Sequence, residues 1–173
     1  MFKYRAAFVL TLLWMFLLMA PVAKAAIGGG EEKNLRGRLG IGFTNQIATN
    51  ASGSTIPALS AKYYLGRSFA TSLATGFDTR AGGSTVVLGA KLFRNMFVES
   101  NLIFYVGGGI AYINRSGSNL QGSLFFGSEF FFDKIPSLGL SFEAGIRGDN
   151  TTGSFAIRTS GDSFLSAGMH FYF

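Results

Sequence analysis

The chain has 173 residues, a formal net charge of +6 and 48% hydrophobic residues, with 15% of all residues aromatic. It contains no cysteine, which excludes disulfides, thiolate metal sites, c-type haem attachment and a lipidated N-terminal cysteine. Only 14% of the residues are Asp, Glu, Lys or Arg, whereas about 25% is usual in a soluble domain, so an ordinary water-exposed surface is disfavoured.

The first 25 residues have the three parts of a secretory signal peptide. Lys3 and Arg5 form a charged start, residues 6–19 are almost wholly apolar, and residues 23–25 form a small-x-small cleavage pattern. A retained membrane helix is the alternative, but the apolar run is shorter than the ~20 residues that a spanning helix needs. We therefore expect a signal peptide over 1–25. Its removal lowers the 15 Lys and Arg to 12, against 9 Asp and Glu, and this small excess does not indicate nucleic acid binding.

After a short N-terminal segment at 26–34, apolar residues alternate with small or polar residues, which is typical of β-strands. The alternation predicts eight strands, at 34–45, 58–66, 68–78, 85–93, 96–110, 120–132, 138–147 and 165–173. In the first of them, one face carries Leu35, Leu39, Ile41 and Phe43. Short connections at 66–67, 94–95 and 133–137 alternate with longer ones at 46–56, 79–83, 114–119 and 149–161. This order predicts an antiparallel up-and-down arrangement with both termini at one end.

The composition of the polar face indicates which face is inside. It consists mainly of Gly, Ala and Ser with a few charged residues, which suits the crowded interior of a narrow barrel. A soluble sandwich or lipocalin-like barrel, the alternative, would expose that face to water. In lipid, only helices or closed barrels satisfy every backbone group. We therefore predict an all-β, eight-stranded antiparallel transmembrane β-barrel over 35–173, with its apolar face outward.

In this register nine charged residues face the lumen. They are Arg36, Arg38, Lys62, Asp78, Lys91, Glu99, Glu129, Glu143 and Arg147. A lone buried charge is costly, so we expect a network of ion pairs that fills the barrel. A lined conduit for a small ion and a pair of catalytic carboxylates are the alternatives. The conduit is disfavoured because about eight strands leave no open aqueous channel.

The remaining motifs carry little chemistry. His170 is the sole histidine and stands in no Ser-His-acid motif that the sequence displays, so we expect a structural role. No His, Asp and Glu cluster has metal-ligand spacing. Residues 107–109 are three glycines that no helix follows, which predicts room for an inner side chain rather than a phosphate loop. We expect no catalytic residue, metal site or cofactor.

The end of the chain carries a more specific signal. The apolar positions of the last predicted strand are Leu165, Ala167, Met169, Phe171 and Phe173. Together with the strand pattern, this ending resembles the small eight-stranded outer-membrane β-barrel proteins of Gram-negative bacteria, the class that includes the OmpA membrane domain and OmpX. In that family such an ending is recognised by the barrel-assembly machinery, so the resemblance implies that machinery and outer-membrane lipid as partners. We also expect a monomer, and the alternation places Tyr172 inward.

Three functional classes are compatible with these patterns. The first is a non-enzymatic barrel with a structural or surface-interaction role, the second a narrow transporter of small ions or apolar molecules, and the third a lipid-modifying membrane enzyme. The lumenal face lacks a long apolar lining and the chain lacks a catalytic constellation, so the first class is favoured. The connections near Ala51, Gly82, Ser116 and Thr151 are expected outside the cell, with both termini in the periplasm.

Overall fold

The computed structural model describes residues 33–48, 56–80, 83–114, 117–149, 155–160 and 166–173. The predicted signal peptide and residues 26–32 lie outside this range. The regular structure of the described residues consists of β-strands alone. Among them there is no helix of the length and apolarity needed to cross a membrane.

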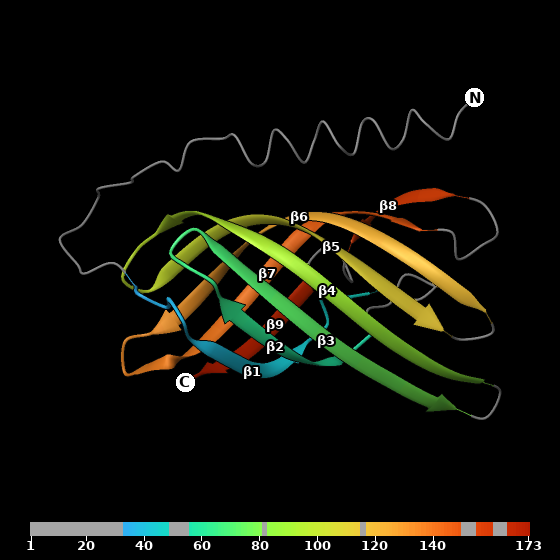
Figure 1. Cartoon of the computed structure of the whole chain (residues 1–173), viewed down its shortest axis with the longest axis horizontal. Coiled ribbons are helices and arrows are strands. Elements are labelled where there is room, and N and C mark those ends of the chain that lie inside the picture. Colours follow the sequence, from blue (N-terminus) through green and yellow to red (C-terminus); the bar gives the residue numbers. More distant parts are fainter. Residues whose placement is uncertain (1–32, 49–55, 81–82, 115–116, 150–154, 161–165) are drawn as a thin grey trace.

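The strands close into one antiparallel up-and-down barrel, as the alternating sequence predicts (Figure 1). They are β1 (Leu39–Thr44), β2 (Ala58–Tyr64), β3 (Phe69–Arg80), β4 (Gly83–Val98), β5 (Leu102–Asn114), β6 (Ser118–Phe132), β7 (Ile135–Asp149), β8 (Ala156–Ser160) and β9 (Ser166–Tyr172). Both β8 and β9 pair with β7, one after the other along its length. They therefore occupy a single position in the wall, and the barrel has eight strands.

Closure of the barrel depends on β9, which lies between the first strand and β7. Ile41 of β1 pairs with Phe171, and Leu140 of β7 pairs with Met169. The wall is uneven in height, because β4 has 16 residues and β6 and β7 have 15, whereas β1 has only 6. The longer strands extend beyond the short ones at the end opposite the C-terminus (Figure 1).

The two faces of the wall differ as the period of two requires. Outward apolar side chains are widely exposed, for example Phe43 at 61%, Leu73 at 64% and Ile110 at 62%. Inward side chains such as Tyr105 and Val87 are fully buried. The barrel thus has a largely apolar outer surface and an interior that contains charged residues such as Lys62, Lys91, Glu129 and Glu143.

Two connections differ most from the sequence prediction. The turn expected at 94–95 is wrong, because β4 continues to Val98 and the connection falls at 99–101. A β-bulge between Asn95 and Phe97 interrupts the alternation there and gives it the local pattern of a turn. Asn95 is buried, and its side-chain Nδ2 donates a hydrogen bond to the carbonyl of Arg67 (2.7 Å). The connection expected at 149–161 contains a strand, β8.

Candidate functional site

The lumen is filled in three layers. At the end with the tight turns, a mainly aromatic cluster includes Tyr64, Phe93, Tyr105, Phe125 and Tyr172. At the opposite end, an aliphatic cluster forms where Ile47 and Ala48, which follow β1, pack against residues of β2, β3, β4 and β5. Charged and hydroxyl side chains lie between these two clusters, and we call this middle layer the polar layer.

The first ion pair of the polar layer joins opposite walls of the barrel. Lys62 of β2 donates to Glu129 Oε2 of β6 at 2.7 Å. Glu129 is fully buried and also accepts hydrogen bonds from Tyr64 and Tyr172, each at 2.6 Å. The carboxylate therefore has three donors, two from β2 and one from β9. This arrangement compensates the loss of hydration that burial of a charge entails.

The second ion pair joins Lys91 of β4 to Glu143 of β7. Tyr105 of β5 donates to Glu143 Oε1 at 3.2 Å. The Lys91 ammonium also lies 4.4 Å from the centre of the Phe125 ring, a distance suited to a cation–π contact. The Lys62 ammonium likewise lies 4.5 Å from the centre of the Phe93 ring, so both lysines of the polar layer have a carboxylate and an aromatic face as neighbours.

Glycines on the inner wall make room for these groups. A Cβ on Gly139 would lie 2.6 Å from Glu129 Oε1, and a Cβ on Gly109 would lie 2.7 Å from Lys91 Cγ. The three glycines at 107–109 were predicted to leave room for an inner side chain, and Gly109 does so for Lys91. Such contacts explain why the inner face alternates small residues with large ones.

Five of the nine charged residues that were predicted to face the lumen are buried. Lys62, Lys91, Glu129 and Glu143 form the two ion pairs, and Arg147 of β7 is buried as well. The two remaining acidic side chains, Asp78 near the end of β3 and Glu99 in the β4–β5 connection, are only partly buried.

The prediction that Arg36 and Arg38 face the lumen is wrong, since both side chains are exposed. Gly37 has φ of 75°, and the Arg38 amide donates to the Leu35 carbonyl at 2.9 Å. This turn precedes β1, so the alternation of a strand does not apply to it. Leu35, expected on the outer face, instead has 3% exposure and belongs to the aromatic cluster.

The apolar residues of the C-terminal strand face outward, whereas His170 and Tyr172, which alternate with them, are buried. Met169, Phe171 and Phe173 are 45%, 45% and 69% exposed, and Ala167 is also exposed. Leu165 lies outside the described residues. Tyr172 faces inward, as the alternation predicts. Recognition of this ending by an assembly machinery remains a prediction.

A serine–histidine contact in the polar layer was not expected from the sequence. Ser60 Oγ of β2 and His170 Nε2 of β9 lie 2.7 Å apart, although 110 residues separate them in the chain. His170 Nδ1 has no hydrogen-bond partner in the described part of the chain, so the acid of a catalytic triad is missing there. The register of β1 between β2 and β9 brings the pair together, and a single sequence carries no signal for it.

The space beside this contact is too small for a substrate. A cavity of about 10 Å³ lies among Ser60, Lys62, Lys91, Glu143 and His170, at the lower limit for one water molecule. Over the described ranges, no group of three or more His, Cys, Asp or Glu could hold a metal ion. The geometry therefore favours a structural role for the polar layer.

The chain was compared with known protein families, curated proteins and solved structures. No protein family, curated protein or solved structure matches this chain.

Proposed function

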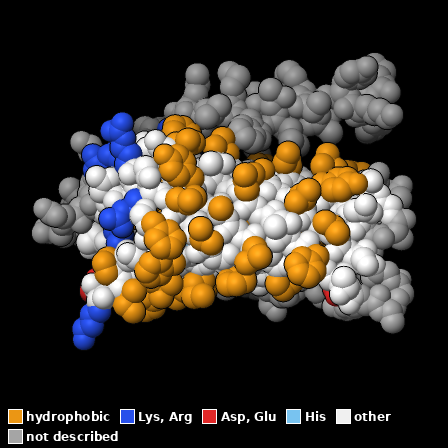
Figure 2. Space-filling model, turned by 60° about the horizontal axis from the view of Figure 1, so that its bottom comes forward, with side chains coloured by type: hydrophobic (Ala, Val, Ile, Leu, Met, Phe, Trp, Pro, Cys, Tyr) orange, Lys and Arg blue, Asp and Glu red, His pale blue; other side chains and the backbone are white. Residues whose placement is uncertain are grey.

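We propose that this chain is an integral outer-membrane β-barrel protein with a side-chain-filled lumen and a structural or surface-interaction role. The observation that carries the proposal is the distribution of polarity. Large apolar side chains cover the outside of the closed wall (Figure 2), and two ion pairs lie buried within it. In water this arrangement would expose a broad apolar surface, whereas lipid would solvate it.

The particular membrane is inferred from the sequence. The predicted signal peptide implies export, and the ending at Met169, Phe171 and Phe173 resembles that of Gram-negative outer-membrane barrels. Assembly by the barrel-assembly machinery follows from the same resemblance, and we further propose that the protein is a monomer.

Filling of the lumen disfavours the transporter alternative. The aromatic cluster, the ion pairs and the aliphatic cluster follow one another along the barrel axis, and the polar layer leaves only about 10 Å³ beside the Ser60–His170 contact. A lipid-modifying enzyme would need reactive groups that lipid can reach, whereas Ser60 and His170 are 6% and 3% exposed. Neither alternative gains a supporting observation from the described residues.

The test compares arginine at two depths on the outer face of one strand. Leu88 lies within the apolar surface of β4 and is 53% exposed, while Ser84, four residues earlier, lies exposed beside the β3–β4 connection. In a bilayer, Leu88→Arg should destabilise the fold by ~2–4 kcal/mol, whereas Ser84→Arg should change stability by at most ~1 kcal/mol. Urea titrations of the protein refolded in phosphatidylcholine vesicles, with the heat-sensitive gel mobility of the folded barrel as readout, measure the difference.

Two outcomes would overturn the proposal. An equal change in stability for the two arginine variants would indicate a soluble barrel. The same conclusion would follow if the wild-type protein stayed monomeric in detergent-free buffer and did not bind vesicles. Planar-bilayer recording tests the filled lumen: the inserted protein should give no steady conductance, and regular single-channel steps would favour the transporter.

A further inference from the structure

Basic side chains gather at the end of the barrel that carries the tight turns. We call this set the basic collar, and it consists of Lys33, Arg36, Arg38, Arg67, Arg94 and Lys134. All are exposed or half-exposed. Figure 2 shows Lys and Arg side chains grouped at that end, directly beyond the apolar surface of the wall.

Backbone contacts hold several parts of the collar around one rim. The Lys33 amide donates to the Glu99 carbonyl at 3.1 Å, and its ammonium donates to the Pro136 carbonyl at 2.6 Å. The chain then crosses to β2, where the Tyr64 amide donates to the Arg38 carbonyl at 3.2 Å. Residues 33–38 therefore span the mouth of the barrel from the turns of β4–β5 and β6–β7 to the end of β2.

The acidic side chains at this end do not neutralise the collar. Glu99 and Asp133 are the acidic residues of the same described turns, so six basic groups exceed the acidic ones by four. Counting Glu31 and Glu32, which precede Lys33 in the sequence, still leaves an excess of two. Partial burial and then the neighbouring Arg38 guanidinium lower the pKa of Lys33, which Asp133 and Glu129 partly oppose.

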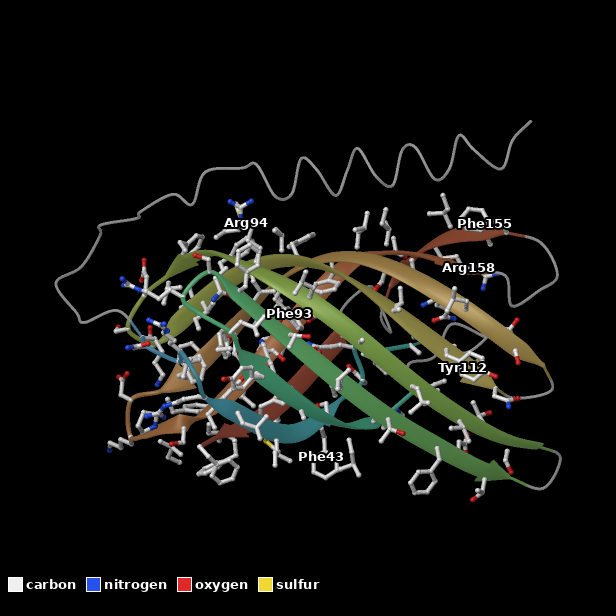
Figure 3. All side chains as sticks on the ribbon, in the orientation of Figure 1. Phe43, Phe93, Arg94, Tyr112, Phe155 and Arg158 are labelled. Atoms are coloured by element: carbon white, nitrogen blue, oxygen red, sulfur yellow. The ribbon has the colours of Figure 1, made fainter. Side chains whose placement is uncertain are left out.

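Apolar and aromatic side chains border the collar. Leu65 and Ile135, within two residues of Arg67 and Lys134 respectively, are 57% and 50% exposed. Outward aromatic rings also lie near this end; they are Tyr63, Phe97, Phe104, Phe132 and Phe173. Arg94 points away from the barrel axis (Figure 3). Cations that ring an apolar belt occupy the depth at which lipid phosphates lie, and their stems can cover apolar surface.

We propose that the basic collar binds the phosphate groups of anionic phospholipids in the leaflet that faces the tight turns. This inference rests on the proposed membrane function. The cations are spread around a rim beside apolar side chains, which suits a lipid that offers a headgroup and acyl chains together. Each Lys or Arg near an anionic membrane surface strengthens attraction by about fivefold, an effect that salt screens.

The experiment first establishes insertion and then measures lipid preference. The barrel is refolded in phosphatidylcholine vesicles and scored by gel mobility. Spin-labelled phosphatidylglycerol and phosphatidylcholine are then added separately, and their relative association with the protein is measured at low and high salt. We expect a preference of about tenfold for phosphatidylglycerol at low salt, decreasing at high salt.

Two triple variants test the residues. Arg36, Arg38 and Lys134 are exposed, and none of their side chains has a hydrogen bond to the barrel wall among those described. The triple R36Q/R38Q/K134Q should reduce the preference to about twofold or less while insertion stays at the wild-type level. The charge-conserving triple R36K/R38K/K134R should keep most of the preference.

The outcomes separate the inference from the function that it rests on. Failure of the wild-type barrel to insert into phosphatidylcholine would overturn both. Insertion with equal association of the two lipids, or a preference that survives the glutamine triple, would overturn the collar alone. Displacement of phosphatidylglycerol by soluble glycerophosphoglycerol at micromolar concentration would show a site for a free phosphate ester and would also contradict the lipid proposal.

Discussion

Glu129 offers a direct test of the polar layer, because three hydrogen bonds converge on its buried carboxylate. In Glu129→Gln the two tyrosine hydrogen bonds become neutral, which weakens each by about 1 kcal/mol. Lys62 also loses its only carboxylate partner among the described contacts, while its ammonium remains buried. Breaking a buried pair in this way destabilises a protein by ~3–5 kcal/mol in total.

Aromatic rings moderate the expected loss. The Lys62 ammonium lies 4.5 Å from the Phe93 ring centre and 4.6 Å from that of Tyr105, and these cation–π contacts persist in the variant. We therefore expect the lower half of the range, about 3–4 kcal/mol. This corresponds to a decrease in the ratio of folded to unfolded protein of at least a hundredfold.

The measurement is a set of urea titrations in phosphatidylcholine vesicles for the wild type, Glu129→Gln, Lys62→Met and the double variant. Lys62→Met should be the milder single change, because both tyrosine donors still serve the carboxylate. The double variant removes both charges and should recover at least half of the loss of Glu129→Gln. A loss below about 0.5 kcal/mol for Glu129→Gln, or strict additivity in the double variant, would refute the ion-pair reasoning.

Three further predictions concern packing, assembly and topology. Gly139→Ala places a Cβ against the buried carboxylate of β6 and should lower stability by ~1–3 kcal/mol in the same titration, whereas Gly122→Ala, whose added Cβ meets no atom within 4 Å, should be near neutral. Deletion of Phe173 removes a hydrogen bond of its backbone amide to β1 at 3.0 Å and should reduce the folded barrel in membrane fractions; wild-type levels would contradict the proposed role of this ending. A cysteine at Ser118 should react with an impermeant thiol reagent on intact cells and one at Arg67 should not, and the reverse pattern would invert the topology.

The strand positions were largely predictable because side chains of a strand alternate between two faces. This periodicity places Lys62, Lys91, Glu129 and Glu143 on the inner face without further knowledge. It carries no information on which residues meet across the lumen, because that depends on strand order, shear and tilt. The Ser60–His170 contact is a case of this kind.

The errors arose where the backbone leaves the regular strand. At Gly37 a turn with positive φ ends the alternation, so Arg36 and Arg38 are exposed and Leu35 is buried. An Arg-Gly-Arg stretch before an apolar run is a signal for such a turn that the sequence did contain. At Asn95 the bulge shifts the period by one residue, and no residue in that stretch distinguishes a bulge from a turn.

The two ion pairs connect strands that are not neighbours in the wall, β2 with β6 and β4 with β7. A hairpin that pairs one residue out of place would turn its inner side chains outward. One charge would then lie on the apolar outer surface while its partner stayed alone inside. The pairs therefore disfavour misaligned strands, and both can form only when β6 and β7 have joined the wall.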